Sequence, residues 1–362
     1  MKNKRLLALV GSICLVLVLA ALPFMAACPA PTPTAPATTP ATTPATTPAT
    51  TPAITPATTP AKVYKVCITQ IVTHPDLDNH RRGFIDGMTE EGFVEGENIY
   101  YIIRNAEGDM PTAASIASYF VSIKPDLIHA ITTPSAQTVV AAAEGTDIPI
   151  VFGTVTDPVT AGLIPSWTQA APHVTGVSDW ADVPTQIKLI VEIVPTAKKL
   201  GMIYNAGETN SVVQRDELVK VAPSLGLTVV EATAATTADV YAAANSLVGR
   251  VDAIWIPTDN TAFSAFDSIL KVCEEHKIPL FGSTTAMVES GACAGAGVDY
   301  YWIGQQCAHM AAKILRGEAT PAQITPMKCE MLVPAVNLAA AERMGITIPQ
   351  SVISKAKVVE EK

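Results

Sequence analysis

The feature that most constrains the fold is the regular alternation of short apolar runs with amphipathic segments over residues 62–362. The apolar runs predict buried strands at 64–72, 98–104, 126–131, 148–155, 199–204, 227–232, 252–256, 279–281 and 292–298. The segments between them predict helices at 77–92, 111–123, 136–144, 184–194, 210–225, 238–248, 262–276, 287–290 and 300–315. This order is typical of an α/β fold in which helices cover both faces of parallel sheets. Nine strands are too many for one small sheet, so we expect two doubly wound, Rossmann-like lobes.

The first 61 residues have a different character. A basic start, the apolar run Leu6 to Phe24 and a small-residue end predict a signal peptide at residues 1–27. The stretch Met25-Ala26-Ala27-Cys28 resembles the bacterial lipoprotein box, which implies lipidation of Cys28, although Met25 stands where Leu, Val or Ile is usual. The alternative is a retained membrane anchor, because the apolar run is nearly long enough to span a bilayer.

We expect residues 28–61 to consist of a lipid-anchored Cys28 and a Pro/Thr/Ala-rich linker, which repeats TTPA and carries no charge. Such a tract predicts an extended tether of roughly 100 Å. Three of the 24 basic residues and none of the 33 acidic residues precede residue 62, so the body has a net charge of −12. An acidic body without a basic run argues against binding to nucleic acid or to an anionic lipid surface.

Five cysteines remain in the body, and no pair has the C-x-x-C spacing of a zinc or redox site. They are Cys67, Cys273, Cys293, Cys307 and Cys329. The favoured interpretation is that they are small buried side chains, and the alternative is a disulfide in an exported protein.

Small polar residues gather where the expected strands end, which is where ligands bind in open α/β sheets. The candidate ligand contacts are His74, Thr133, Ser135, Thr156, Asp157, Asn205, Glu208, Asn210, Ser211, Asp259, Asn260 and Asp299. Any one of them could instead be a helix N-cap or a turn residue. Six strand ends with such groups favour a binding site between two lobes.

The mixture of groups indicates the kind of ligand. Hydroxyls and free backbone N–H groups at a helix start, as at Thr133-Pro134-Ser135, suit a carboxylate. The four acidic candidates suit an ammonium, and the asparagines suit either group. This combination predicts an amino-acid zwitterion better than a phosphate, for which lysine or arginine would be expected, or a sugar, for which more aromatic residues would be expected.

Enzyme motifs are missing from the sequence, which has no G-x-S-x-G, H-E-x-x-H, G-x-x-x-x-G-K-[ST] or strand-linked G-x-G-x-x-G pattern. The six histidines lack the spacing of metal ligands. We therefore expect neither catalysis nor a cofactor nor a metal. A hydrolase on this fold is an alternative that lacks a recognisable nucleophile–base pair.

The body resembles the substrate-binding lipoproteins of ABC transporters with the type I periplasmic-binding fold, in the group that includes receptors for tryptophan and other aromatic amino acids. The matching stretches, in chain order, are ITQIVTHPDLD (68–78), NAEGD (105–109), PIVFGTVTDPVTAGL (149–163), VTGVSD (174–179), IYNAGETNS (203–211), PTDN (257–260) and GVDYYWIGQQCAHMAAKILRG (297–317). Carried over by position, the residues that would face the cleft are Thr133, Ser135, Asp157, Asn205, Asn210, Ser211, Asp259 and Asp299. Thr73, where many relatives have Glu, and Ser283-Thr284-Thr285, where Ser-Asp is frequent, depart from the pattern.

The resemblance implies a receptor that captures a small ligand by hinge closure and delivers it to a membrane permease with a separate ATPase subunit. The ligand would be an amino acid, with an aromatic one preferred. The alternative is a ligand-sensing ectodomain that signals to a membrane receptor. We expect lobe 1 to contain residues 62–179 and 282–328 and lobe 2 to contain 180–281 and 329–362, so that the chain crosses three times.

Overall fold

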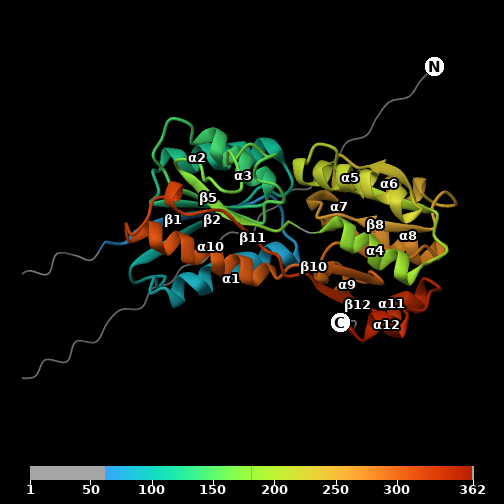
Figure 1. The fold of residues 1–362 in the computed structure, drawn as a ribbon. Coiled ribbons are helices and arrows are strands. Elements are labelled where there is room, and N and C mark those ends of the chain that lie inside the picture. Colours follow the sequence, from blue (N-terminus) through green and yellow to red (C-terminus); the bar gives the residue numbers. More distant parts are fainter. Residues whose placement is uncertain (1–61, 181, 361–362) are drawn as a thin grey trace, which may run out of the picture. The chain divides into compact units, whose positions relative to one another are not determined.

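The computed structural model describes residues 62–180 and 182–360. The predicted signal peptide at 1–27, the lipidation site Cys28 and the linker up to residue 61 lie outside the described residues. Within the described part, the chain forms two α/β lobes, each with its own sheet and hydrophobic core (Figure 1). The predicted fold class, two parallel sheets with helices around them, is confirmed.

Lobe 1 consists of residues 62–179 and 298–329, whose apolar side chains form one core. Its six-stranded sheet has the order β11-β5-β4-β3-β1-β2, and every neighbouring pair is parallel. The strands are β1 Tyr64–Gln70, β2 Ile99–Asn105, β3 Leu127–Ile131, β4 Ile150–Gly153, β5 Val174–Ser178 and β11 Met327–Lys328. The helices are α1 Pro75–Glu90, α2 Met110–Ser122, α3 Thr133–Ala142, α10 Tyr300–Leu315 and the 3₁₀ turn Pro321–Gln323.

Lobe 2 consists of residues 182–297 and 333–360 around a second core. Its seven-stranded sheet has the order β13-β12-β10-β9-β8-β6-β7, with only β10 and β12 antiparallel. The strands are β6 Lys199–Tyr204, β7 Thr228–Thr233, β8 Ala253–Ile256, β9 Leu280–Gly282, β10 Ala294–Gly297, β12 Val333–Val336 and β13 Lys357–Val358. The helices are α4 Val183–Ile193, α5 Thr209–Val221, α6 Val240–Ser246, α7 Asn260–Ser264, α8 Phe266–His276, α9 Thr285–Glu289, α11 Leu338–Arg343 and α12 Gln350–Ile353, with 3₁₀ turns at Ala222–Leu225 and Thr237–Asp239.

One predicted boundary is wrong. Residues 282–297 were expected in lobe 1, but β10 pairs with β9 and β12 in the second sheet, so the chain crosses after Gly297 rather than at residue 282. The strand Ala294–Gly297 is built of alanine and glycine, and its backbone fits tightly because a Cβ on Gly295 would lie 2.4 Å from the carbonyl oxygen of Gly282. An alternation of strands and helices does not tell which sheet a strand joins, and this crossing was misplaced for that reason.

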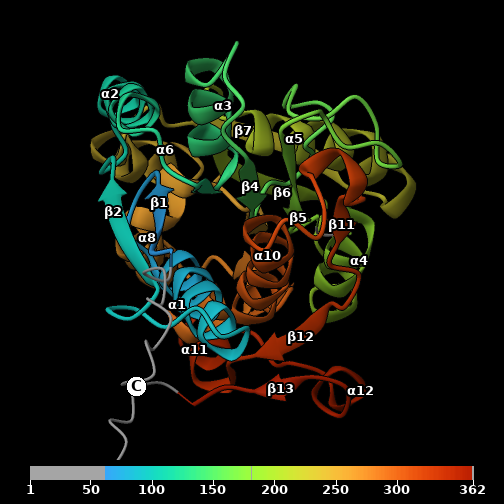
Figure 2. The same cartoon turned by 90° about the vertical axis from the view of Figure 1, so that its left-hand side faces the viewer.

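Helices α1 and α10 lie side by side on one face of the first sheet, as Figures 1 and 2 both show. They approach closely because glycines line their contact: a Cβ on Gly83 would lie 2.1 Å from the carbonyl oxygen of Tyr301, and one on Gly304 would lie 2.1 Å from that of His80. Both helices begin at the end of the first sheet that faces lobe 2. Their tight packing therefore fixes the position of the residues in their first turns.

Candidate functional site

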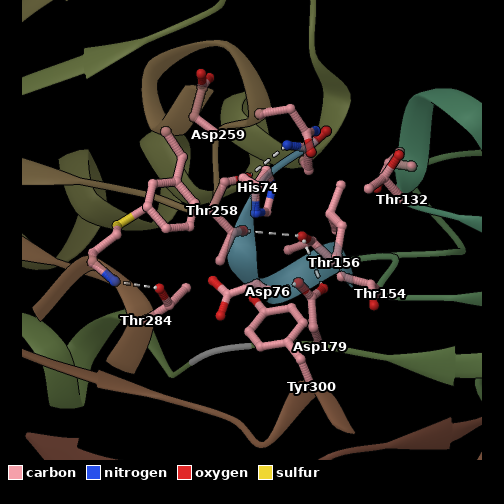
Figure 3. Close-up of a pocket in the computed structure, with 16 residues that line it drawn as sticks. His74, Asp76, Thr132, Thr154, Thr156, Asp179, Thr258, Asp259, Thr284 and Tyr300 are labelled. Atoms are coloured by element: carbon pink, nitrogen blue, oxygen red, sulfur yellow. Dashed lines mark hydrogen bonds between the residues drawn. The ribbon is translucent and has the colours of Figure 1, made fainter. Parts of the chain in front are cut away.

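A cavity lies between the lobes, and we call it the interlobe cavity (Figure 3). Lobe 1 lines it with His74, Asp76, Leu77, Thr132, Thr133, Thr154, Thr156, Asp179 and Tyr300, and lobe 2 with Asn210, Thr258, Asp259, Asn260, Phe263, Thr284 and Met287. Nearly all of these residues follow the carboxyl end of a strand or open the next helix. This is the predicted location for a ligand between doubly wound sheets.

Buried carboxyl groups dominate the charge of the interlobe cavity. Asp76 and Asp179 lie close to Tyr300 on one side, and Asp259 lies apart from them (Figure 3). Burial raises the pKa of Asp76 to about 7 and that of Asp179 to about 6, the latter against hydrogen bonds from the Tyr300 and Thr156 hydroxyls. Burial and the neighbouring Glu208 also raise the pKa of Asp259. Since neither lysine nor arginine is among the described residues that line the cavity, it favours a ligand that carries a positive group.

Hydroxyls and helix ends provide a second kind of contact. Helix α3 begins at the cavity after Thr132, whose side chain does not cap the helix, so its first N–H groups have no partner inside the helix. Thr132 and Thr154 both have positive φ angles, 85° and 58°, which are rare for β-branched residues. Backbone strain of this kind typically clusters at binding sites. The first turn of α3 is thus suited to a carboxylate.

Apolar and aromatic side chains also line the interlobe cavity. Leu77, Phe263 and Met287 line the cavity, and the rings of His74 and Phe263 are 4.6 Å apart. Burial lowers the pKa of His74 to about 4, so this imidazole is neutral at pH 7. The walls of the cavity therefore combine apolar and aromatic side chains with the polar groups.

Buried polar atoms without partners are concentrated here. His74 Nδ1, Asp76 Oδ2, Thr132 Oγ1, Thr133 Oγ1 and Asn210 Oδ1 all belong to residues that line the interlobe cavity and have no hydrogen-bond partner in the described structure. Leaving such an atom unsatisfied costs about 1–3 kcal/mol. A cluster of them, with acceptors and hydroxyls mixed, indicates that a polar ligand completes this site.

Half of the twelve predicted contacts line the interlobe cavity: His74, Thr133, Thr156, Asn210, Asp259 and Asn260. Three more support these residues from behind. Ser211 Oγ donates to Asp259 Oδ2 at 2.6 Å, the backbone N–H of Asn205 donates to the same oxygen at 2.6 Å, and the carboxylate of Glu208 accepts from the Asn210 side chain at 3.0 Å. Asn205 and Glu208 also line an adjoining outer groove that shares Asn260 with the cavity.

The other three predicted contacts do not line the cavity. Asp157 accepts from the backbone N–H of Val159 at 3.0 Å and closes a local turn, and Asp299 caps α10 by accepting from Trp302 N at 3.0 Å. Asp157 is thus a turn residue and Asp299 a helix N-cap, the two roles that were the alternative for every candidate. Ser135 is buried in the first turn of α3, and its hydroxyl has no partner.

Several lining residues were not predicted. Asp76 follows Pro75 and reads as an ordinary acidic residue in a helix first turn, while Asp179 opens a segment that crosses between the lobes. Phe263 and Met287 have the spacing of core residues. Tyr300 directly follows the predicted residue Asp299. Its position just after a predicted strand is the only feature of the sequence that could have indicated it as a cavity residue.

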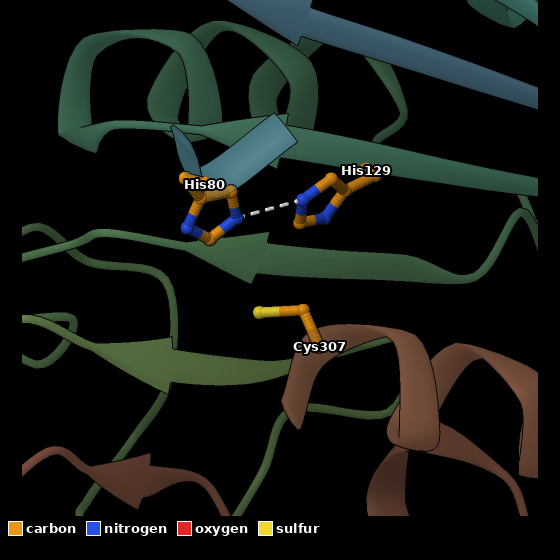
Figure 4. A group of neighbouring side chains, drawn as sticks. All are labelled: His80, His129 and Cys307. Carbon is orange, nitrogen blue, oxygen red and sulfur yellow. Dashed lines mark hydrogen bonds between the residues drawn. The ribbon is translucent and has the colours of Figure 1, made fainter. Parts of the chain in front are cut away.

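Folding also brings together residues that are scattered in the sequence. His80, His129 and Cys307 are buried, and one potential ligand atom from each lies within 4.8 Å of the others (Figure 4). The five described cysteines are free and buried, and burial raises the pKa of each thiol. The favoured interpretation of these cysteines as buried small side chains is confirmed.

Comparison with known proteins identifies the family. The model of the family described as ABC transporter substrate binding protein matches residues 65–360. The chain belongs to this family. A tyrosine-binding protein from Clostridioides difficile (strain R20291) is 42% identical over 258 residues, which are 71% of this chain and 74% of that protein.

Two solved structures show how such substrate-binding proteins compare in shape. The L-Trp complex of an ABC domain from Streptococcus pneumoniae has 32% identity and a TM-score of 0.79, and the alignment covers 83% of this chain and all of that one. The ligand-free, open structure of a substrate-binding protein with adhesive properties from Clostridium difficile has 38% identity and a TM-score of only 0.62 at the same coverage. The present structure is thus closer in shape to the ligand-bound relative than to the open one, although the open one is closer in sequence.

Membership in the family confirms the predicted function as a substrate-binding protein rather than an enzyme. The fold is that of the type I periplasmic-binding proteins, as the predicted resemblance implied. In the part of the chain that the structure describes, no helix has the length and apolar character needed to cross a membrane.

Proposed function

We propose that this substrate-binding protein is a lipid-anchored, extracytoplasmic receptor that captures an aromatic amino acid between its two lobes. The observation that carries the proposal is the cluster of unpartnered buried polar atoms in the interlobe cavity. These atoms need a ligand with both donors and acceptors. An amino-acid zwitterion provides both on one carbon atom.

The chemistry of the cavity supports this ligand class. The ammonium would be bound by oxygens such as Asn210 Oδ1 and the buried carboxylates, and the carboxylate by the uncapped first turn of α3 with its threonine hydroxyls. An aromatic side chain would then pack against Phe263 and His74. The relatives point to the same class, since one is named a tyrosine-binding protein and another is solved with L-Trp.

Hinge closure would hold the ligand, because residues of both lobes line the same cavity. Direct contacts already join the lobes: the Gln137 amide donates to Thr209 Oγ1 at 3.3 Å, and the hydroxyls of Thr156 and Thr258 are 3.4 Å apart. A ligand that bridges the lobes stabilises the closed state in proportion to its preference for that state. The closed lobes would then be delivered to a permease with its ATPase, while acyl chains on Cys28 would keep the receptor at the membrane.

Thermal melting tests the ligand class. The protein without its first 61 residues is melted with each of the twenty amino acids, several nucleosides and simple sugars. A ligand at 100 times its dissociation constant stabilises the folded state by about 2.7 kcal/mol, so a true ligand raises the melting temperature clearly. We expect tyrosine, tryptophan or phenylalanine to raise it most. A response to sugars or nucleosides alone would contradict the proposal.

A matched pair of variants tests the site. Asn210→Ala removes an unpartnered amide oxygen at the cavity, and Asn245→Ala removes an exposed asparagine from α6. We expect Asn210→Ala to weaken binding by about 10-fold or more, because a hydrogen bond to a charged group is worth about 1.5–3 kcal/mol. Asn245→Ala should bind as the parent does. Equal affinity in all three proteins would remove Asn210 from the site.

The sensing alternative predicts a different partner for the same binding body. Ligand uptake by vesicles that contain this protein together with its permease and ATPase subunits would support the function as an importer. Ligand capture without uptake, together with ligand-dependent activation of a membrane kinase or chemoreceptor, would support the sensor.

A further inference from the structure

A chain of hydrogen bonds runs from the interlobe cavity into the core of lobe 1. Figure 4 shows the bond at its centre, between two buried imidazoles. The Thr154 hydroxyl is 2.7 Å from His80 Nδ1, His80 Nε2 is 2.9 Å from His129 Nε2, and His129 Nδ1 is 2.8 Å from the carbonyl oxygen of Val151. Thr154 lines the cavity, whereas both histidines are fully buried. The chain thus links a cavity residue to groups that a ligand does not touch.

The protons in this chain can occupy only one arrangement when both rings are neutral. Burial lowers the pKa of His129 to about 4, and burial and the neighbouring His129 hold the pKa of His80 well below its usual value. The carbonyl oxygen of Val151 can only accept, so the proton of His129 is on Nδ1. His129 Nε2 must then accept from His80 Nε2, which leaves His80 Nδ1 to accept from the Thr154 hydroxyl.

The packing around the rings fixes this arrangement. Phe84 stacks on His129 with ring centroids 3.9 Å apart, and the two imidazoles are nearly parallel. Gly153 gives His80 its space, because a Cβ there would lie 2.3 Å from His80 Cε1. The Cys307 thiol, 3.5 Å from the carbonyl oxygen of Phe152, has a separate partner.

The consequence appears at Thr154. Its hydroxyl proton points to His80, so only lone pairs of its oxygen remain for any other partner. We propose that the His80–His129 pair is a positioning device that keeps the Thr154 hydroxyl a hydrogen-bond acceptor toward the interlobe cavity, so that this point selects a donor such as an ammonium. The preference for an ammonium rests on the proposed function, whereas the proton arrangement does not.

The proton arrangement can be measured without a ligand. In the full-length chain labelled with ¹⁵N-histidine, long-range ¹H–¹⁵N correlations distinguish a protonated ring nitrogen from one with a lone pair. We expect the Nε2–H tautomer at His80 and the Nδ1–H tautomer at His129 at pH 7. An Nδ1–H tautomer at His80 would overturn the proposal, because that nitrogen would donate to Thr154.

The same spectra separate this role from a metal site made of His80, His129 and Cys307. A metal bound to both Nε2 atoms would force the proton of His80 to Nδ1 and reverse the polarity of Thr154. We expect equimolar Zn²⁺ to leave both sets of ring signals unchanged. If Zn²⁺ shifted both Nε2 signals to the chemical shifts of metal-bound nitrogen, a metal site would replace the proposal.

Two substitutions of His129 test the effect on binding. His129→Leu removes the acceptor for His80, so His80 should change to the Nδ1–H tautomer and the dissociation constant for L-tyrosine should rise by about 10-fold or more. His129→Gln keeps an acceptor and should restore both the tautomer and most of the affinity. If the tautomer of His80 changed but the affinity for L-tyrosine did not, Thr154 would not select the ligand. Failure of every protein to bind any amino acid, with the expected tautomers, would refute the proposed function and the ammonium preference but leave the proton arrangement standing.

Discussion

Replacing Asp76 by Asn should stabilise the unliganded protein and weaken its binding of ligand. Asp76 is 5% exposed, and one of its carboxyl oxygens has no partner. Burial is the largest cause of its high pKa of about 7, and the charges of Asp179 and Glu289 add to it. An ionised Asp76 is thus held at a cost that a hydrogen bond from Thr284 offsets only in part, and a ligand donor would lower this cost further.

The size of this cost follows from the pKa. The shift from 3.8 to about 7 corresponds to about 4 kcal/mol at 1.36 kcal/mol per pKa unit. Because the pKa in the folded state is the higher one, the folded protein binds this proton more tightly, and stability is lost as the pH rises from about 4 through 7. The amino end of α1 favours a nearby carboxylate, so about 4 kcal/mol is an upper limit.

Urea denaturation of the ligand-free protein at several pH values measures the effect. We expect Asp76→Asn to match the parent near pH 4 and to exceed its unfolding free energy by about 2–4 kcal/mol at pH 8. The exposed Asp147→Asn is the control and should follow the parent at every pH. Affinity for an aromatic amino acid at pH 8 should fall by about 10-fold or more in Asp76→Asn only. An Asp76→Asn variant with the parent's pH profile and affinity would refute this reasoning.

Three further predictions concern the same region. Phe263→Leu should weaken binding of an aromatic ligand by about 3–10-fold, because ring–ring contacts contribute about 0.5–1.5 kcal/mol beyond the burial of apolar area. An unchanged affinity in titration calorimetry would contradict this contact. Ligand binding at pH 6.5 should release protons, since an ammonium lowers the pKa of the buried carboxyl groups; calorimetry in two buffers of different ionisation enthalpy would show proton uptake if this is wrong. Gly153→Ala should lower the unfolding free energy by about 1–3 kcal/mol, because its Cβ would press on His80, and an unchanged urea midpoint would count against the tight packing.

The two-sheet fold could be predicted from the sequence because long segments with strong hydrophobic periodicity indicate strands and helices reliably. Four short strands were missed. β5 is Val-Thr-Gly-Val-Ser, whose apolar residues are too few to stand out, β12 is Val-Pro-Ala-Val, which a proline interrupts, and β11 and β13 have two residues each. The crossing after Gly297 was misplaced because the choice of sheet depends on backbone packing between small residues. Such packing has no signature in a linear pattern.

The candidate site was predicted as far as strand ends determine it. Asn210 and Asp259 follow strands and line the cavity. Asp157 also follows a strand, yet its carboxylate turns back to cap its own loop, and the residue type alone does not distinguish these outcomes. Asp179 and Phe263 reach the cavity through the arrangement of the two lobes, which depends on contacts far apart in the chain.

The central claim is that the interlobe cavity binds an aromatic amino acid through both its ammonium and its carboxylate. The most direct test is a calorimetric titration of the purified protein with L-tyrosine and L-tryptophan, beside tyramine and 3-(4-hydroxyphenyl)propionate, which each lack one of the two charged groups. We predict one-to-one binding of at least one of the two amino acids at roughly micromolar affinity, and a loss of 10-fold or more for each truncated compound. Equal binding of a truncated compound, or no binding of any aromatic amino acid, would contradict the claim.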